Sequence, residues 1–177
     1  MRAVAARAGR EVDPGAVCRR VLGIPEFGSA ACVALFASLP AEIPTRPLFE
    51  AARQARKRCL LPRTVAPGEL AFAEVACWED LRRGRYGVRE PIGGDEVPLA
   101  EAGVVVVPGV AFDSTGGRLG RGGGYYDRAL AGLDRTTCLV VGVTFSGCVV
   151  DEVPRADWDE PVDVVVTERE VLRGWSR

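Results

Sequence analysis

The chain has 177 residues, of which 47% are hydrophobic and 27% are charged, and its formal net charge is -1. A chain of this length builds one good hydrophobic core, and so small a net charge gives no reason to expect binding to nucleic acid or to anionic membranes. The sequence contains no histidine, so it lacks the imidazole base on which the usual serine and cysteine hydrolases depend.

Short apolar runs alternate with helical stretches in the first half of the chain. The stretch 45–56 places Leu48, Phe49 and Ala52 on one face, as in an amphipathic helix. Residues 78–83 are expected to form a short turn of helix. Three runs of apolar and β-forming residues predict strands: residues 31–37, residues 58–61 (ended by Pro62) and residues 70–76.

The clearest core strand is GVVVVP at residues 103–108. Its continuous β-branched residues indicate burial on both faces, which is typical of a parallel sheet. A helix is expected at about residues 124–131, and two further strands at residues 138–145 and 162–167. Strands that alternate with helices predict an α/β fold with a mainly parallel sheet, built as a single domain over residues 1–177.

Six cysteines are scattered along the chain, and no two of them form a C-x-x-C pair. A structural zinc site without histidine would need four thiolates from distant positions, so we expect buried free thiols in a reducing cytoplasm instead. No apolar run approaches the roughly 18 residues of a membrane span, and the first residues lack the apolar segment of a signal peptide. We therefore expect a cytoplasmic protein.

Residues 118–127 read RLGRGGGYYD, with four glycines in five positions. Such a cluster costs backbone entropy, but the absence of Cβ lets several N–H groups turn toward one point, which suits phosphate oxygens. The loop should follow a core strand and precede a helix, whose N-terminus adds positive charge, and Arg118 and Arg121 can donate to the same oligophosphate. The alternative is a glycine-rich surface turn without a ligand.

Two better-known glycine patterns do not fit this loop. The dinucleotide pattern G-x-G-x-x-G would need glycine at position 125, where Tyr125 stands. A Walker A motif would need a G-K-[ST] triplet, which the sequence lacks. The loop therefore predicts a phosphate site of another type.

The stretch PGVAFDSTGGRLGRGGGYYDRAL at residues 108–130 resembles the hallmark of the 5-formyltetrahydrofolate cyclo-ligases, which are also called methenyltetrahydrofolate synthetases. The resemblance covers residues 16–168 and implies a Rossmann-like three-layer fold of the NagB/RpiA/CoA-transferase-like type. Four further stretches agree with the family in the same order: PEFGSAACVALFASLPAEIPT from Pro25, LPR from Leu61, GRYGVREP from Gly84 and DWDEPVDVVVTE from Asp157.

The resemblance implies a reaction in which Mg-ATP converts 5-formyltetrahydrofolate into 5,10-methenyltetrahydrofolate, with release of ADP and phosphate. The formyl oxygen attacks the γ-phosphoryl group, and a neighbouring nitrogen then closes the ring as phosphate departs. Such chemistry rests on positioning and charge stabilisation, which suits a chain without histidine. We expect the chain to act as a monomer on a reduced folate and ATP, with no nucleic-acid or membrane partner.

The resemblance also implies which residues form the site. Arg121 and Tyr125 match the catalytic positions, and Arg121 would neutralise charge on the transferred phosphoryl group. The magnesium ligands would be Asp127 and Asp159, since magnesium favours carboxylates together with phosphate oxygens. The ATP positions are Arg2, Arg118, Leu119, Gly120, Arg121, Gly122, Gly123, Gly124, Tyr125 and Tyr126, and the folate positions are Ala37, Glu42 and Tyr86.

Several of these residues also have an ordinary structural interpretation. Glu42 would accept the paired donors of the pterin and Tyr86 would flank its ring, where stacking contributes about 0.5–1.5 kcal/mol. The alternatives are a surface acid for Glu42, a half-buried aromatic for Tyr86, a helix-start aspartate for Asp127 and a solvated turn residue for Asp159. We assign Phe112 to core packing.

The N-terminus departs most from the family pattern. The family opens with a helix that carries K-x-x-L-R, whose cations reach the ATP phosphates, whereas this chain opens MRAVAARAGR. Met1-Arg2 then matches the Leu-Arg pair, the lysine position falls before residue 1, and the helix is shortened. Either the start is displaced or the nucleotide is held with one cation fewer.

Three functions remain open at this point. The first is the cyclo-ligase reaction itself, and the second is a paralogue that acts on another formylated or carboxylated compound. The third is a non-catalytic protein that binds a nucleotide or a folate. Arg121, Asp127 and Asp159 favour catalysis, because their charges serve phosphoryl transfer.

Overall fold

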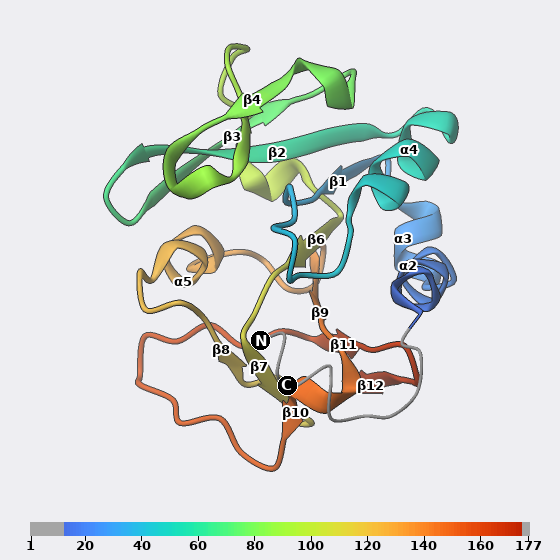
Figure 1. Ribbon diagram of the computed structural model, residues 1–177, viewed down its shortest axis with the longest axis vertical. Helices are drawn as coiled ribbons and strands as arrows, with labels where there is room; N and C mark the ends of the chain where they lie inside the picture. Colours follow the sequence, from blue (N-terminus) through green and yellow to red (C-terminus); the bar gives the residue numbers. More distant parts are fainter. Residues whose placement is uncertain (1–12, 175–177) are drawn as a thin grey trace.

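The computed structural model describes residues 13–174 of the chain, and its largest element is a seven-stranded sheet (Figure 1). Across the sheet the strands are β12 (Val171–Arg173), β11 (Val164–Val166), β9 (Leu139–Val143), β6 (Val104–Val107), β1 (Cys32–Ala34), β2 (Arg58–Ala66) and β3 (Glu69–Glu74). The inner five strands run parallel to one another, and β3 and β12 close the two edges in the antiparallel sense. The α/β class with a mainly parallel sheet is confirmed.

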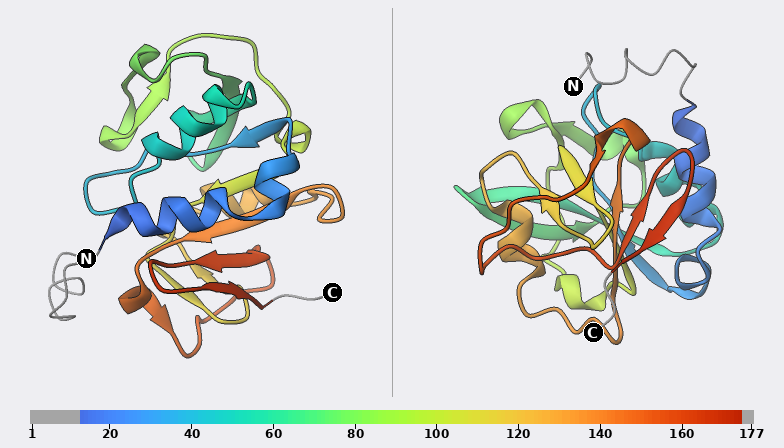
Figure 2. Two further views of the ribbon diagram at one scale, coloured as in Figure 1. Left: turned by 90° about the vertical axis from the view of Figure 1, so that its right-hand side faces the viewer. Right: turned by 90° about the horizontal axis from the view of Figure 1, so that it is seen from below.

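Helical elements cover both faces of this sheet (Figures 1 and 2). One face carries α2 (Pro14–Leu22), α3 (Pro25–Ser29) and α4 (Arg46–Gln54), and the other carries α5 (Tyr125–Leu130) and the turn η4 (Leu99–Glu101). Along β6, Val104 and Val106 pack on the first face while Val105 and Val107 pack on the second. All four valines are at most 1% exposed, so the continuous β-branched run is buried on both faces as its composition indicated.

Two small sheets and three short turns extend beyond the large sheet. The first small sheet holds β10 (Val149–Val150), β7 (Ala111–Asp113) and β8 (Arg118–Leu119), and the second is a hairpin of β4 (Leu81–Arg83) and β5 (Arg89–Pro91). The turns are η2 (Trp78–Asp80), η3 (Arg85–Gly87) and η5 (Ser146–Cys148). Sequence patterns missed these strands, since two or three residues are too few to show a period.

Two expectations about local structure were wrong. Pro62 does not end β2 but pairs with Phe72 inside it, at a point beyond the pairing of β2 with β1. The carbonyl of Phe72 accepts the N–H of Val97 at 2.8 Å, so the 62–72 pair exchanges no ladder bond that proline would lose. Residues 81–83 form β4 rather than part of a helical turn, because β5 offers them a backbone partner.

The topology creates a crevice at the carboxyl ends of the central strands, where the strand order reverses. From β1 the chain adds β2 and β3 on one side, then crosses back to add β6, β9 and β11 on the other. The strand order therefore reverses between β1 and β6, and the loops after their carboxyl ends separate there. In open α/β sheets ligands bind at this place.

The cysteines match the expectation of free thiols. Cys18, Cys32, Cys59 and Cys138 are buried, Cys148 is half-buried and Cys77 is exposed, and all six are free. Burial raises the pKa of Cys59 and of Cys138 to about 11, which keeps both thiols protonated at neutral pH. Within residues 13–174, no helix combines the length and apolar character that crossing a bilayer requires.

Candidate active site

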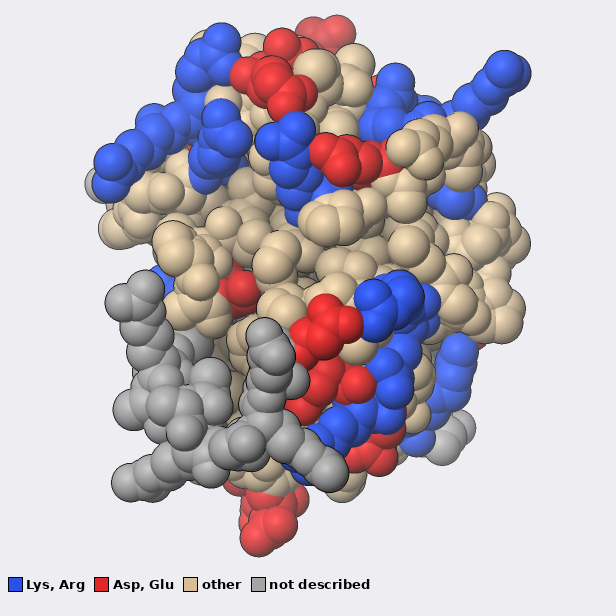
Figure 3. Space-filling model, turned by 45° about the vertical axis from the view of Figure 1, so that its right-hand side comes forward, with Lys and Arg blue, Asp and Glu red and all other residues tan. Residues whose placement is uncertain are grey.

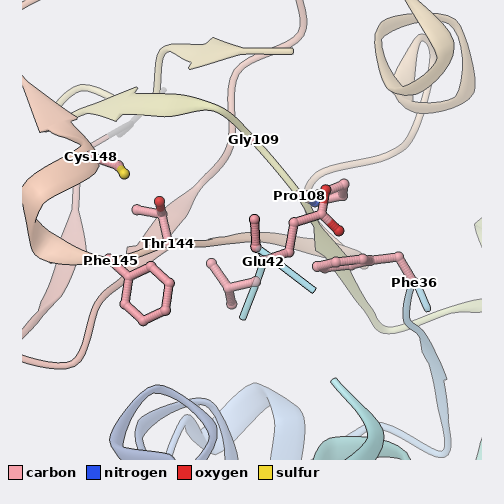
Figure 4. A pocket seen from close by; sticks show the side chains of 9 residues that line it. Phe36, Glu42, Pro108, Gly109, Thr144, Phe145 and Cys148 are labelled. Atoms are coloured by element: carbon pink, nitrogen blue, oxygen red, sulfur yellow. The ribbon is translucent and has the colours of Figure 1, made fainter. Parts of the chain in front are cut away.

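A pocket lies at the carboxyl ends of β1, β6 and β9, where the strand order reverses. Its lining comes from the last residue of β9 and from the segments that follow these three strands (Figure 4). The rings of Phe36 and Phe145 lie on opposite sides of it, and the carboxylate-bearing residue in its wall is Glu42. The remaining lining residues are Ala41, Pro108, Gly109, Val143, Thr144 and Cys148.

The loop between β1 and α4 holds Glu42 in a fixed position. Its Oε2 accepts the backbone N–H of Leu39 at 2.8 Å, and its own N–H donates to the carbonyl of Leu39 at 2.9 Å. The hydroxyl of the fully buried Thr45 donates to the carbonyl of Phe36 and closes the loop. Ala37 is 3% exposed and belongs to the core, so its side chain does not line the pocket.

The glycine loop runs from β8 into α5, as expected, although β7 and β8 separate it from the core strand β6. Gly122 and Gly124 have φ of +83° and +62°, a left-handed conformation that side chains other than glycine rarely adopt. A Cβ on Gly122 would meet no atom within 4 Å, so the outer side of the loop is open. A Cβ on Gly123 would lie 2.7 Å from the ring of Tyr125.

Arg118 lies beneath this loop rather than on its outer side. Its side chain is 3% exposed, and its Nη2 donates to Oδ1 of Asp127 at 2.5 Å. The guanidinium carbon lies 5.8 Å from the ring centroid of Tyr126, whose pKa burial raises above its usual value. The Arg118–Asp127 pair therefore joins β8 to α5 across the base of the loop.

Arg121 lies on the outer side of the loop, and its side chain is 55% exposed. Its Nη2 donates to Oε1 of Glu42 at 2.9 Å, although the two residues stand 79 positions apart in the chain. The glycine loop and the pocket are thus neighbours. Two residues that the motifs assigned to different substrates meet between them.

Two tyrosines from distant segments meet beside the loop. The hydroxyls of Tyr86 and Tyr125 lie 3.2 Å apart, and the rings pack edge to face with centroids 6.3 Å apart. Tyr86 has a φ of +60° and is 67% exposed, an unfavourable conformation for an aromatic residue that is typical of functional sites. Its hairpin is fastened to β2, because Glu90 accepts the hydroxyl of Thr64 at 2.9 Å.

The two expected magnesium ligands lie in neighbouring segments. Oδ2 of Asp159 accepts the N–H of Ala156 at 2.7 Å, and the N–H of Glu160 lies 3.4 Å from Oδ1 of Asp127. Among residues 13–174 no group of three or more Asp, Glu, Cys or His side chains gathers as a metal cage would require. Arg2, expected at the phosphates, lies outside the described residues.

One buried carboxylate that sequence reasoning missed organises the segments around the site. Asp113 is 1% exposed and accepts hydrogen bonds from Thr115, Gly117, Val153 and Arg155. Burial alone would raise its pKa, but these bonds outweigh burial and hold the pKa well below its usual range. The local pattern D-S-T-G-G signals a turn, whereas nothing in the sequence points to the partners on residues 153–155.

Arg128 is a second residue that sequence reasoning missed. Its Nε donates to the carbonyl of Gly68 at 2.7 Å, and its Nη2 donates to the carbonyl of Gly123. The turn between β2 and β3 is thereby fastened to the glycine loop. Phe112, assigned to core packing, is fully buried as expected.

Curated relatives share most of the length of this chain. The chain is 35% identical over 156 residues to the 5-formyltetrahydrofolate cyclo-ligase of Escherichia coli K12, with 86% of each covered. It is 30% identical over 155 residues to the protein of the same name from Haemophilus influenzae, with 85% of this chain and 83% of that one covered.

Solved structures and a family match complete the comparison. The NMR structure of Aquifex aeolicus 5,10-methenyltetrahydrofolate synthetase has a TM-score of 0.80 at 36% identity, over 93% of this chain and 82% of that one. The 5,10-methenyltetrahydrofolate synthetase of Mycoplasma pneumoniae has a TM-score of 0.71 over 93% of each chain; at 18% identity it supports the fold alone. The sequence profile of the 5-formyltetrahydrofolate cyclo-ligase family matches residues 1–168. The chain belongs to the 5-formyltetrahydrofolate cyclo-ligase family.

Proposed function

We propose that this chain catalyses the ATP-dependent conversion of 5-formyltetrahydrofolate to 5,10-methenyltetrahydrofolate, with ADP and phosphate as the other products. The observation that carries the proposal is the 2.9 Å contact between Arg121 and Glu42. The family motifs associate Arg121 with the phosphates of ATP and Glu42 with the pterin ring. Their contact beside the pocket supports a single site in which both substrates meet.

Different residues around this contact bind the pterin and the transferred phosphoryl group. The carboxylate of Glu42 accepts the amide and amino donors of the pterin, and Tyr86 flanks the ring, where stacking contributes about 0.5–1.5 kcal/mol. Bound ATP supplies the phosphoryl group that activates the formyl oxygen. Arg121 neutralises charge on that group. Tyr125, the first residue of α5, is the second catalytic residue in this proposal.

The glycine loop fits an oligophosphate. Its outer residues Arg121, Gly122 and Gly123 are exposed, and the space above Gly122 is open, so backbone N–H groups can approach phosphate oxygens there. Leu119, Gly120 and Gly124 complete the loop at its two ends, and the buried Arg118 with Tyr126 supports it from below. Arg2 remains a proposed further cation for the phosphates.

The donor groups also fit magnesium. Oδ1 of Asp127 accepts from Arg118 and Glu160, while its Oδ2 accepts no hydrogen bond from residues 13–174. Among the same described residues, the carboxylate of Asp159 accepts a hydrogen bond at Oδ2 alone, from the N–H of Ala156. Each carboxylate thus keeps one oxygen for a cation, and magnesium commonly takes one or two carboxylates and completes its shell with phosphate oxygens and water.

An absorbance assay for the methenyl product tests this function. Purified protein should form product from 5-formyltetrahydrofolate only when both ATP and magnesium are present. Turnover that continues unchanged in EDTA would contradict the proposal, as would the absence of product at millimolar substrate. In the second case, ATP binding without turnover would indicate a binding protein, and turnover of another formylated compound would indicate a paralogue.

We also propose that residues 1–177 act as a single domain and as a cytoplasmic monomer on small molecules, with a sheet of the NagB/RpiA/CoA-transferase-like type. The charge pattern supports a small-molecule role. Basic and acidic side chains intermix on the face in Figure 3 rather than gather by sign. Oppositely charged side chains also form ion pairs, such as Arg173–Glu26 at 2.9 Å and Arg19–Asp13 at 2.6 Å. Gel filtration tests the monomer.

A further inference from the structure

The Arg121–Glu42 ion pair occupies groups that both substrates need. Oε1 of Glu42 is taken by Nη2 of Arg121 at 2.9 Å, and Oε2 is taken by the N–H of Leu39 at 2.8 Å. A pterin that presents paired donors to this carboxylate competes with the guanidinium for Oε1. A phosphate competes with the carboxylate for the guanidinium. Each substrate that takes these groups therefore binds at the expense of the pair.

The two halves of the pair are not equally free to move. Glu42 is 11% exposed and is fastened to Leu39 by two hydrogen bonds within its own loop. Arg121 is 55% exposed, and its long side chain extends from the open outer side of the glycine loop. The guanidinium is thus the half that can exchange partners, because water solvates it once it leaves Glu42, whose Oε2 stays bonded to the N–H of Leu39.

Resting on the proposed function, we propose that Glu42 has a second role as a positioning residue: it holds Arg121 away from the phosphates until the pterin takes over its carboxylate. The pair then couples the two binding events. The first substrate must break the pair, and the second finds its own residue already released. By linkage, each substrate raises the affinity for the other by the same factor.

Removing the charge of Glu42 should raise the affinity for ATP, whereas simple damage to the site would lower it. Replacing Glu42 by glutamine keeps its shape and removes its charge, so Arg121 becomes available to ATP before any folate binds. The Glu42→Gln variant should bind ATP more tightly than the wild type, by about three- to fivefold, which is the range for a partly exposed ion pair. Its binding of folate should weaken.

Isothermal titration of Mg-ATP without folate tests this on four proteins: wild type, Glu42→Gln, Arg121→Met and the double variant. If Glu42 acts through Arg121, the gain of the glutamine variant disappears in the Arg121→Met background. If the carboxylate merely repels phosphate, the same gain appears in both backgrounds and the proposal is overturned. Glu26→Gln is the matched control, because Glu26 pairs with Arg173 at 2.9 Å in a different part of the sequence, and it should leave ATP affinity unchanged.

A second titration measures the coupling directly. The affinity of a non-hydrolysable ATP analogue should rise by about three- to fivefold when 5-formyltetrahydrofolate saturates the wild type, and the Glu42→Gln variant should lose this rise. ATP binding by the wild type without a gain in Glu42→Gln would overturn the positioning role alone. A wild type that binds no ATP at all would overturn the proposed function and this proposal together.

Discussion

Arg118 in β8 and Arg121 in the glycine loop stand three positions apart, and each pairs with a carboxylate, yet the first arginine is buried and the second is exposed. The Arg118–Asp127 pair is 3% and 16% exposed and measures 2.5 Å. In the Arg121–Glu42 pair the arginine is 55% exposed, the glutamate is 11% exposed and the distance is 2.9 Å. Breaking a buried pair leaves a charge without water or partner, whereas an exposed guanidinium is readily solvated. The buried pair therefore holds the loop, and the exposed Arg121 can exchange its carboxylate partner for a substrate.

The largest effect should come from Arg118→Met. Removing the guanidinium leaves Asp127 partly buried without its charged partner and uncovers Tyr126, so we expect a loss of about 3–5 kcal/mol in the free energy of unfolding. Urea unfolding measures it, with Arg121→Met as the matched variant. That variant should lose less than about 1 kcal/mol, because the lost guanidinium is exposed and Glu42 keeps its hydrogen bond from the N–H of Leu39. Equal losses in the two variants would remove the contrast between the pairs.

Asp113 sharpens the contrast, because it is a second buried carboxylate that serves structure. Its pKa lies below the unfolded value of about 3.9, so its stabilisation is complete above that pH and is lost as the pH falls through and below it. We expect Asp113→Asn to cost about 2–3 kcal/mol at pH 7. In unfolding curves from pH 7 to pH 3, the difference in free energy of unfolding between the variant and the wild type should narrow below about pH 4. A constant gap, or an equal loss in the exposed-site control Asp80→Asn, would contradict this role.

Asp127 tests whether the buried pair also serves catalysis. Asp127→Asn keeps an oxygen for Arg118 but removes the charge that would hold magnesium, so we expect turnover to fall at least about tenfold, or about 1.4 kcal/mol. The magnesium concentration for half-maximal rate should rise in the same experiment. Wild-type rates and magnesium dependence would leave Asp127 with a structural role only.

The smallest effect should come from the glycine loop itself. A side chain at position 123 would lie 2.7 Å from the ring of Tyr125, so Gly123→Val should displace that ring and crowd the open side of the loop. We expect ATP affinity to fall about fivefold, with less than about 1 kcal/mol lost in stability. Gly93→Val is the control, because a Cβ there meets nothing within 4 Å. A large stability loss with unchanged ATP affinity would assign Gly123 to packing.

The sequence was informative where a pattern repeats or a motif is long. Four consecutive valines predicted the central strand β6, and the glycine-rich motif predicted a loop that enters a helix. The motifs also named Glu42 and Arg121, whose contact the structure reveals, although their roles toward substrates stay predictions.

Long-range polar contacts could not be predicted in this way. Asp113 meets Val153 and Arg155 from 40 and 42 positions away, and Arg128 meets Gly68 from 60 positions away. Such pairs leave no periodic signal, because each depends on how separate loops pack. Arg118 could not be predicted for another reason: the motif placed it with the ATP residues, and the sequence does not show that its side chain is buried and bonded to Asp127.

The most direct test of the central claim is an ATP titration of Arg121→Met beside its unfolding curve. With 5-formyltetrahydrofolate saturating, losing a charge-assisted hydrogen bond to phosphate should weaken binding of a non-hydrolysable ATP analogue by at least about tenfold, while the free energy of unfolding changes by less than about 1 kcal/mol. That result would assign the exposed arginine to the substrate. Unchanged ATP affinity together with a loss of several kcal/mol in stability would contradict the account, because Arg121 would then hold the loop as Arg118 does.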